Sequence, residues 1–180
     1  MAYKFLESKI SVSTDNAIHV AKNIKLQDLD NPELRLESCG NLASKLAESD
    51  RIREELIFFQ RDFPKKKVGA VLDGRDIGSV IFPDAKIKLF VVADLEVRAQ
   101  RRQVDYKRMG QEYSLRNLTE KLKERDKRDK IRKVSPLICM PDAIVFDNSE
   151  ISFERLNKEI IEIVKKKYKS LNLDINIKKK

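Results

Sequence analysis

IKLFVVAD, residues Ile87–Asp94, is the stretch that decides the fold class. It is a short run of Ile, Leu, Phe and Val that ends in Asp. Two runs of the same kind lie elsewhere in the chain, VGAVLD at Val68–Asp73 and AIVFD at Ala143–Asp147. Short apolar runs without alternation are typical of strands buried on both faces of a parallel sheet. We therefore predict three such strands.

Helical patterns lie between and after these runs. LEVRAQRRQVDYKRMG begins after Asp94, a suitable N-cap, and ends at Gly110. SLRNLTEKLKERDKRDKIRK, residues 114–133, and SFERLNKEIIEIVKKKY, which begins at the N-cap candidate Ser152, each carry apolar residues at helical spacing. This alternation predicts an α/β fold, a parallel sheet with helices on both faces.

The first part of the chain has only helical patterns. LRLESCGNLASKLAES and DRIREELIFFQRDF, residues 34–49 and 50–63, predict adjacent helices, with LQDLDNPEL as a loop before them. Their expected core residues are Leu34, Leu42, Leu46, Ile52, Leu56 and Phe59. No linker composition interrupts the chain, so we predict a single domain over residues 1–170 and a basic tail over 171–180.

The composition narrows the class of protein. The 180 residues include 41% hydrophobic and 37% charged residues, with a formal net charge of +9, which suits an anionic partner or a solvated basic surface. Cys39 and Cys139 form no CxxC pattern, and the single His19 has no companion motif, so we expect no disulfide and a surface histidine. Without an apolar run of about 20 residues or a signal-peptide pattern, we expect a cytoplasmic protein that binds no membrane.

Gly-Arg-Asp-Ile-Gly, residues 74–78, follows the first predicted strand. Ligands of open parallel sheets bind at the carboxyl ends of strands. Gly74 and Gly78 allow a tight backbone, Arg75 offers a planar fork of donors for a phosphate, and Asp76 offers an acceptor for an amine. A turn with an ordinary Arg-Asp ion pair is an equally good interpretation of this segment alone.

KERDKRDKIRK, Lys123–Lys133, is the second charged segment. Helical spacing places four of its residues on one face: Arg125, Arg128, Asp129 and Arg132. Arginines repel one another at this spacing unless an anion neutralises them, and arginine clamps are a main device of phosphoryl transfer. A solvated charged helix would explain the charge but not the alignment of the arginines.

A nucleotide-binding phosphate loop is not found in the sequence. The single GxxxxG match, GAVLDGRD, is followed by no Lys-Ser/Thr pair and has a strand-like interior, and there is no GxGxxG. We therefore assign no cofactor-binding residues and no metal ligands.

Three segments together resemble bacterial cytidylate kinases, the (d)CMP kinases of the nucleoside monophosphate kinase family. They are LASKLAESDRIREELIFFQRDF, DGRDIGSVIFPDAKIKLFVVAD and ERDKRDKIRKVSPLICMPDAIVFDNS, in the order of the family. The resemblance covers most of residues 34–168 and implies a P-loop kinase-like fold. It implies transfer of the ATP γ-phosphoryl group to CMP or dCMP with Mg²⁺, by a monomer that binds no nucleic acid.

The resemblance also assigns roles to residues. Ser44, Arg53 and Asp76 match positions that contact the cytosine base. Arg75 and Arg132 match arginines on the acceptor phosphate, and Arg125 and Asp129 match a pair near the ribose and phosphate. Arg128 matches a lid or transfer arginine. Arg125 and Arg128 are thus the expected catalytic residues, and the others are expected to bind substrate.

The chain departs from the family at its start. Family members begin with a strand, a GxxxxGKGT-type loop and a helix, and Met1–Ile10 aligns with a later helix. We therefore expect a piece of about 30 residues or more to be missing. In the family that first strand is central, so its loss would leave a gap in the sheet and unpaired backbone groups.

Two other functions stay open. One is an inactive remnant that binds nucleotide without transferring phosphate. The other is a basic nucleic-acid-binding module, against which stand the 7% aromatic content, the lack of a nucleic-acid-binding motif and the interleaving of basic with acidic residues.

Overall fold

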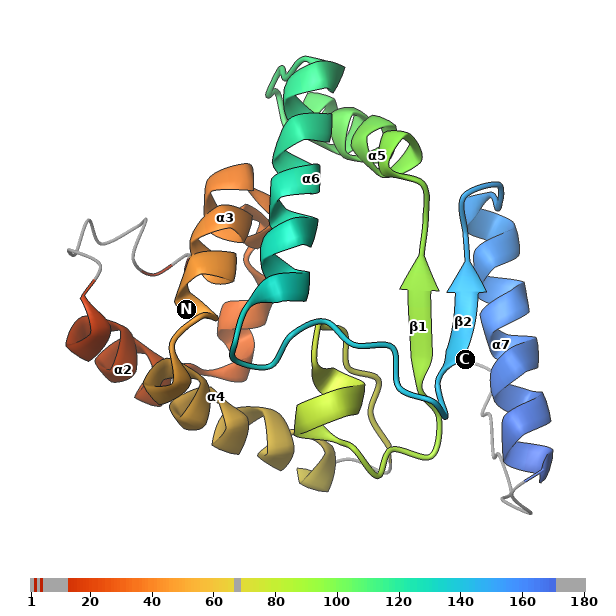
Figure 1. Ribbon diagram of the computed structural model, residues 1–180, viewed down its shortest axis with the longest axis horizontal. Helices are drawn as coiled ribbons and strands as arrows, with labels where there is room; N and C mark the ends of the chain where they lie inside the picture. The colour runs from red at the N-terminus through yellow and green to blue at the C-terminus, as the bar shows by residue number, and fades with distance from the viewer. Residues whose placement is uncertain (1, 3, 5–12, 67–68, 171–180) are drawn as a thin grey trace.

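The computed structural model describes Ala2, Lys4, residues 13–66 and residues 69–170. In chain order its main elements are α2 (Thr14–Lys22), α3 (Glu37–Leu46), α4 (Asp50–Asp62), β1 (Leu89–Val92), α5 (Leu95–Arg108), α6 (Leu115–Ile131), β2 (Ile144–Asp147) and α7 (Phe153–Ser170). Figure 1 shows α2, α3 and α4 on one side, β1, β2 and α7 on the other, and α6 beside α3.

The helices that the sequence predicted, α3 to α7, begin and end close to the predicted residues. α2, α6 and α7 each begin after a serine: Ser13, Ser114 and Ser152. The hydroxyl oxygen of each serine accepts a hydrogen bond from a backbone N–H group in the first turn of its helix, where such groups have no partner within the helix. Asp94 precedes α5 in an extended conformation, but its side chain makes no capping hydrogen bond. Gly110, with φ +72°, ends α5 in the left-handed conformation that favours glycine.

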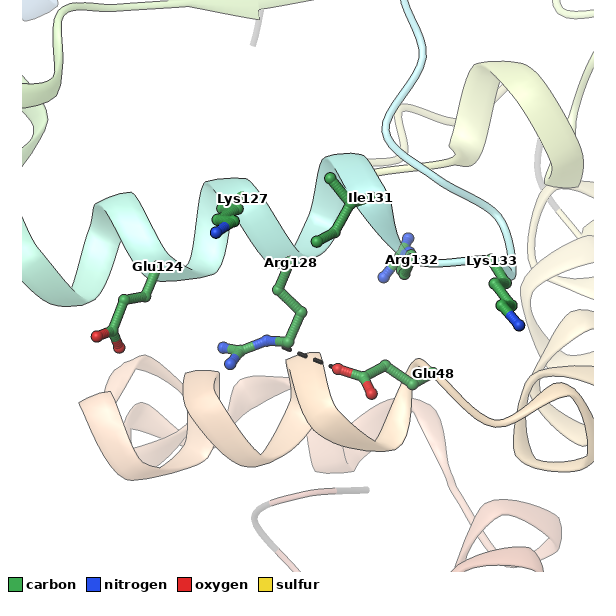
Figure 2. A pocket seen from close by; sticks show the side chains of 7 residues that line it. All are labelled: Glu48, Glu124, Lys127, Arg128, Ile131, Arg132 and Lys133. Atoms are coloured by element: carbon green, nitrogen blue, oxygen red, sulfur yellow. Dashed lines mark ion pairs between the residues drawn. The ribbon is translucent and has the colours of Figure 1, made fainter.

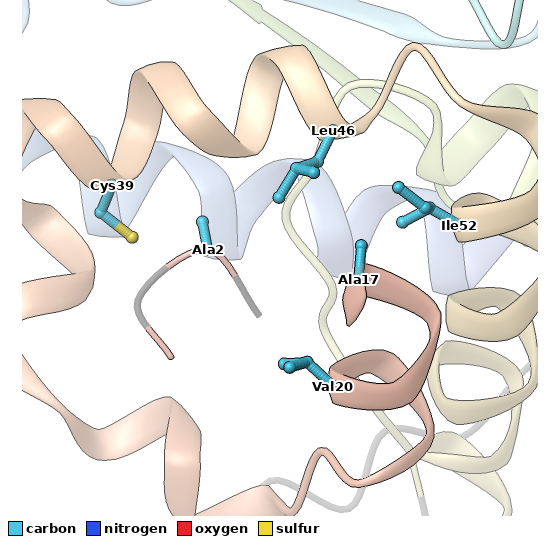
Figure 3. Close-up of a cluster of buried hydrophobic side chains, with 6 residues drawn as sticks. All are labelled: Ala2, Ala17, Val20, Cys39, Leu46 and Ile52. Atoms are coloured by element: carbon cyan, nitrogen blue, oxygen red, sulfur yellow. The ribbon is translucent and has the colours of Figure 1, made fainter. Parts of the chain in front are cut away.

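The core of the N-terminal half forms between α2, α3 and α4 (Figure 3). Its buried residues are Ala2, Ala17, Val20, Cys39, Leu46 and Ile52. Of the residues expected in this core, Leu46 and Ile52 are buried, Leu34, Leu42 and Leu56 pack against the cluster, and Phe59 is half-buried. The expected loop at residues 26–34 contains two short 3-10 turns, Leu26–Asp30 and Pro32–Arg35.

A second core joins α5 and α6. Ala99 and Tyr106 of α5 are buried against Leu118 and Leu122 of α6. Full burial of a leucine such as Leu118 stabilises the folded chain by about 2 kcal/mol. This packing fixes α6, which carries the second charged segment, and α6 also contacts α3.

The sheet has two parallel strands among the described residues. β1 pairs with β2 in the register Leu89↔Ile144 to Val92↔Asp147. The crossover between them contains α5 and α6, as a parallel connection requires. Both strands fall inside the runs predicted for them, which confirms the parallel α/β class.

The third predicted strand, Val68–Asp73, is not formed. Val68 lies outside the described residues, Gly69–Asp73 has no strand structure, and Val71 is 97% exposed. A strand needs a neighbour that pairs with its backbone groups, and no described strand pairs with this segment. The prediction of a strand over this segment is therefore wrong for Gly69–Asp73.

Burial of the strands on both faces was also wrongly predicted. Val91 in β1 is 52% exposed and Val145 in β2 is 60% exposed, whereas Phe146 is buried. Burial on both faces requires layers of helices over the whole sheet. In the described part of the chain those layers are incomplete.

The single histidine and the two cysteines lie among the described residues. His19 is exposed, as expected, and neither cysteine forms a disulfide. No helix within the described ranges is long and apolar enough for a membrane span. The proposed tail, residues 171–180, and most of Met1–Ile10 lie outside the described residues.

Candidate functional site

A buried carboxylate, Asp129 of α6, is the centre of the site. Asp129 is 1% exposed. Ser44 Oγ of α3 donates a hydrogen bond to Asp129 Oδ1 at 3.0 Å, and Arg75 Nε lies 3.1 Å from Oδ2. Arg125 Nε and Arg132 Nη1 lie 3.8 and 3.7 Å from the carboxylate oxygens. We call these five residues the Asp129 cluster.

The helical period of α6 explains part of this arrangement. Arg125 and Asp129 are one turn apart, and Arg132 is the C-cap residue, where the backbone leaves the helix with ψ 141°. The side chains of Arg125 and Arg132 are 22% and 4% exposed, so both face inward. Three of the segment's lysines are exposed instead: Lys123, Lys127 and Lys130.

Arg128 of α6 is linked to the Asp129 cluster by a hydrogen bond to Ser44 of α3. Its Nε donates to Ser44 Oγ at 2.9 Å and lies 3.9 Å from Glu48 Oε1. Figure 2 shows the Arg128 side chain directed from α6 toward α3. A pocket of about 440 Å³ opens here, lined by Glu48, Glu124, Lys127, Arg128, Ile131, Arg132 and Lys133.

Arg53 and Asp76 form a second ion pair next to the cluster. Arg53 Nη2 of α4 binds Asp76 Oδ2, and the two side chains are 11% and 9% exposed. Arg53 Nε also donates to Ser135 Oγ at 3.1 Å. Ser135 in turn accepts from Arg132, so this pair is connected to the Asp129 cluster.

The Gly-Arg-Asp-Ile-Gly turn directs two adjacent side chains to different partners. Arg75 pairs with Asp129 and Asp76 pairs with Arg53, so the turn is not closed by an Arg75–Asp76 ion pair. A Cβ on Gly74 would lie 2.8 Å from Ile77 Cγ1, and one on Gly78 would lie 3.3 Å from Lys88 Cδ. Both glycines therefore permit the close approach that the sequence suggested.

The site has an excess of positive charge, most deeply buried at Arg132. Arg75, Arg125 and Arg132 face one carboxylate in the cluster. Burial, reinforced by the charge of Arg75, lowers the pKa of Arg125, and burial, reinforced by Arg53, lowers the pKa of Arg132. Three atoms of the described cluster are buried without a hydrogen-bond partner, the donors Arg125 Nε and Arg132 Nη2 and the acceptor Asp129 Oδ2. Such donors suit an anionic ligand, because an unpaired buried N–H group is costly.

A neighbouring group of residues escaped sequence reasoning. The hydroxyl group of Tyr106 in α5 donates a hydrogen bond to Glu37 Oε2 at 2.8 Å and accepts one from Arg102 Nε at 3.0 Å. Burial, with the Glu37 carboxylate adding to it, raises the pKa of Tyr106 to about 12. A Cβ on Gly40 of α3 would lie 3.2 Å from Arg125 Nη1 and 3.4 Å from Arg102 Nη2. Gly40, which the sequence gave no reason to single out, thus makes room for two guanidinium groups.

All eight residues predicted for the site belong to one polar network. They are Ser44, Arg53, Arg75, Asp76, Arg125, Arg128, Asp129 and Arg132. Sequence reasoning missed Ser135, which links the two halves. Its signals were weak: a serine that follows the charged segment and precedes a proline.

The comparison with known families identifies the chain's relatives. Residues 3–166 match the family model described as cytidylate kinase. This chain belongs to the cytidylate kinase family. Its fold is accordingly of the P-loop kinase type, and the family is one of phosphotransferases. A nucleic-acid-binding module is therefore not favoured.

Named cytidylate kinases are similar over much of the chain. One from Methylococcus capsulatus is 45% identical over 128 residues, which cover 71% of this chain and 57% of that protein. One from Cereibacter sphaeroides is 37% identical over 164 residues, covering 91% of this chain and 79% of the relative. One from Afipia carboxidovorans is 41% identical over 148 residues, covering 82% and 71%. The chain thus spans from under three fifths to about four fifths of these cytidylate kinases.

Proposed function

We propose that this cytidylate kinase family chain transfers the γ-phosphoryl group of ATP to CMP or dCMP, giving ADP and CDP or dCDP, a step of pyrimidine nucleotide metabolism. The observation that carries the proposal is the Asp129 cluster, in which three guanidinium groups converge beside the Arg53–Asp76 pair. Guanidinium groups can bind the phosphate of a nucleotide, and the neighbouring Asp76 carboxylate can accept a hydrogen bond from an amine on its base.

The Arg53–Asp76 pair, with Ser44, is the proposed base-reading part. A carboxylate accepts a hydrogen bond from the exocyclic amine of cytosine, and the guanidinium group of Arg53 holds that carboxylate in place. Ser44 Oγ is already oriented by Asp129 and Arg128. These assignments follow the family resemblance residue by residue.

The Asp129 cluster is the proposed phosphate-binding part. In the structure Asp129 neutralises part of the charge of Arg75, Arg125 and Arg132. Arg75 keeps a side chain 38% exposed, so it can contact a ligand at the surface. A phosphate would accept the buried N–H groups of Arg125 and Arg132 that lack partners among the described residues.

Transfer would proceed in line, without a covalent enzyme intermediate. Charge spreads over the equatorial oxygens of the transferring group, so catalysis consists mainly of positioning and electrostatic stabilisation. Arg125 and Arg128 would supply this stabilisation, with Arg75 and Arg132 holding the acceptor. Arg128 lines the pocket of Figure 2, which supports a role for it in contacting the transferring group.

Mg²⁺ would arrive with the phosphates of ATP. No group of three His, Cys, Asp or Glu side chains suited to a metal comes together in the described ranges. Mg²⁺ is commonly held by substrate phosphates and one or two protein groups, so such a group is not required. We assign the chain's own residues no metal-dependent step.

We further infer that the chain acts as a cytoplasmic monomer on nucleotides rather than on nucleic acid. Both cysteines are free, as suits a reducing compartment. Arg116, Arg125 and Arg128 of α6 each face a carboxylate instead of forming a continuous basic face. Their partners are Glu120, Asp129 and Glu48. Light scattering of the purified chain and an RNA-binding titration at several salt concentrations would test these inferences.

A coupled ADP-release assay with CMP and Mg-ATP tests the transferase proposal. The 180-residue chain would be assayed beside its Arg128→Ala variant. CMP-dependent ADP release by the wild-type chain, strongly reduced in the variant, is the expected result. If the chain bound CMP but released no ADP, it would be an inactive nucleotide-binding remnant. Binding of neither nucleotide would contradict the proposal.

A further inference from the structure

Ser135 has an unusual backbone conformation. It is the one non-glycine residue with positive φ, +47°, among the described residues. Residues other than glycine avoid this region, and strained residues of this kind persist only where their surroundings hold them in place. Ser135 lies in the loop after α6, between Arg132 and Leu137. The backbone N–H of Leu137 donates a hydrogen bond to the Asp129 carbonyl oxygen at 2.7 Å.

The contacts of Ser135 explain what holds it. Its hydroxyl oxygen accepts a hydrogen bond from Arg53 Nε at 3.1 Å. Its carbonyl oxygen accepts a hydrogen bond from Arg132 Nε at 2.8 Å. A single residue thus contacts one arginine from each half of the site, and these arginines come from different helical segments, α4 and the end of α6.

Contacts at Nε orient a guanidinium group. The group is planar, so fixing Nε restricts the directions in which its two Nη atoms point. In Arg53 an Nη atom binds Asp76, and in Arg132 an Nη atom faces Asp129. Ser135 therefore restrains the Arg53–Asp76 pair relative to the Asp129 cluster.

We propose that Ser135 is a positioning residue that determines the preference for CMP over UMP. This inference rests on the proposed function. Cytosine offers an amine where uracil has a carbonyl, so the discrimination depends on where the Asp76 carboxylate lies relative to a phosphate bound at Arg132. Without the Ser135 hydroxyl, Arg53 keeps only the long hydrogen bond from Nη1 to the Ala47 carbonyl at 3.4 Å and its contact with Asp76. The guanidinium group can then rotate and carry the Asp76 carboxylate away from the amine.

Isothermal titration of the 180-residue chain with CMP and with UMP tests the proposal. Ser135→Ala removes the hydroxyl and keeps the carbonyl contact to Arg132. Ser135→Gly also removes it but tolerates φ +47°, so it folds even if the alanine variant does not. Ser114→Ala is the matched control, because it removes a serine hydroxyl that caps α6 and contacts no arginine of the site.

The proposal predicts a change in selectivity. Both Ser135 variants should bind CMP about tenfold more weakly, as expected for loss of a hydrogen bond to a charged group, with UMP affinity little changed. Ser114→Ala should lower the unfolding temperature with an unchanged CMP-to-UMP ratio. Equal weakening of both nucleotides, or no weakening, in the Ser135 variants would overturn the inference.

The wild-type chain separates failure of the inference from failure of the proposed function. If it bound CMP and UMP equally, the selectivity role of Ser135 would be wrong while nucleotide binding stood. If it bound neither, the proposed function would itself be wrong, and the inference about Ser135 with it.

Discussion

Ser44 Oγ lies 3.0 Å from Asp129 Oδ1, although 85 residues separate the two in the sequence. The bond joins α3 to α6, and both residues are buried. The same carboxylate faces three arginines of the proposed phosphate-binding part. The contact therefore holds two helices together and also orients residues proposed to bind the ligand. Variants of the cluster are therefore expected to change both stability and ligand affinity.

Asp129→Asn should destabilise the protein by about 3 kcal/mol, because buried guanidinium groups would lose their counter-charge. Inorganic phosphate should raise the unfolding temperature of this variant by more degrees than it raises that of the wild type. Thermal unfolding with and without phosphate measures both effects. Asp105→Asn, in an exposed ion pair of α5, should cost less than about 0.5 kcal/mol. Similar losses in the two variants would contradict the role of Asp129.

Arg75→Ala should weaken CMP binding by about tenfold or more, because it removes a charged donor from the proposed phosphate site. Lys130→Ala, an exposed change on the same helix as Asp129, should alter the affinity less than about twofold. Titration calorimetry compares them directly. Equal effects would count against the assignment of Arg75.

Gly40→Ala should separate stability from function. Alanine favours the helix by up to about 1 kcal/mol, but its Cβ would lie 3.2 Å from Arg125 Nη1. We expect an unchanged or higher unfolding temperature together with CMP affinity lowered several-fold. Ser38→Ala, an exposed change in the same helix, should leave the affinity unchanged. Retained affinity in Gly40→Ala would mean that Arg125 has room to move.

Gly74→Ala should destabilise the turn that carries Arg75 and Asp76. The new Cβ would lie 2.8 Å from Ile77 Cγ1, and such overpacking costs about 1–3 kcal/mol. Gly69→Ala is the matched control, since its Cβ would meet no atom within 4 Å. Urea unfolding of both variants tests the difference. A neutral Gly74→Ala would show that the turn can shift without cost.

Tyr106 should make the protein sensitive to alkaline pH. Its pKa rises from 10.0 to about 12 in the folded chain, so the folded state favours the protonated phenol. This stabilisation is complete below pH 10 and is lost as the pH rises through about 12. The difference in unfolding free energy between the wild type and Tyr106→Phe should therefore shrink by about 2 kcal/mol over this range. A constant difference would disprove the raised pKa.

The sequence predicted local features better than distant ones. The bounds of α5 and α6 and the shared face of Arg125, Arg128 and Asp129 follow from the helical period, which needs no tertiary information. The strand at Val68–Asp73 failed because a strand depends on a neighbour far away in the chain. Likewise, no spacing rule pairs Arg75 with Asp129 rather than with the adjacent Asp76.

The residues missed by sequence reasoning are those whose role depends on packing. Tyr106 reads as an ordinary aromatic residue of a helix, and only the approach of α3 brings Glu37 to its hydroxyl group. The positive φ of Ser135 cannot be read from its residue type. The family resemblance assigned roles to the site residues, but it did not say which side chains contact one another.

The contact between α3 and α6 at Asp129 has a consequence for how the chain folds. The site's segments are far apart in the sequence, and long-range contacts form slowly because large loops have to close first. Ability to bind a nucleotide should therefore appear late during refolding, after α5 and α6 have packed together. A nucleotide added to a refolding mixture would select molecules that have completed assembly, and recovery of binding would report the last stage of folding.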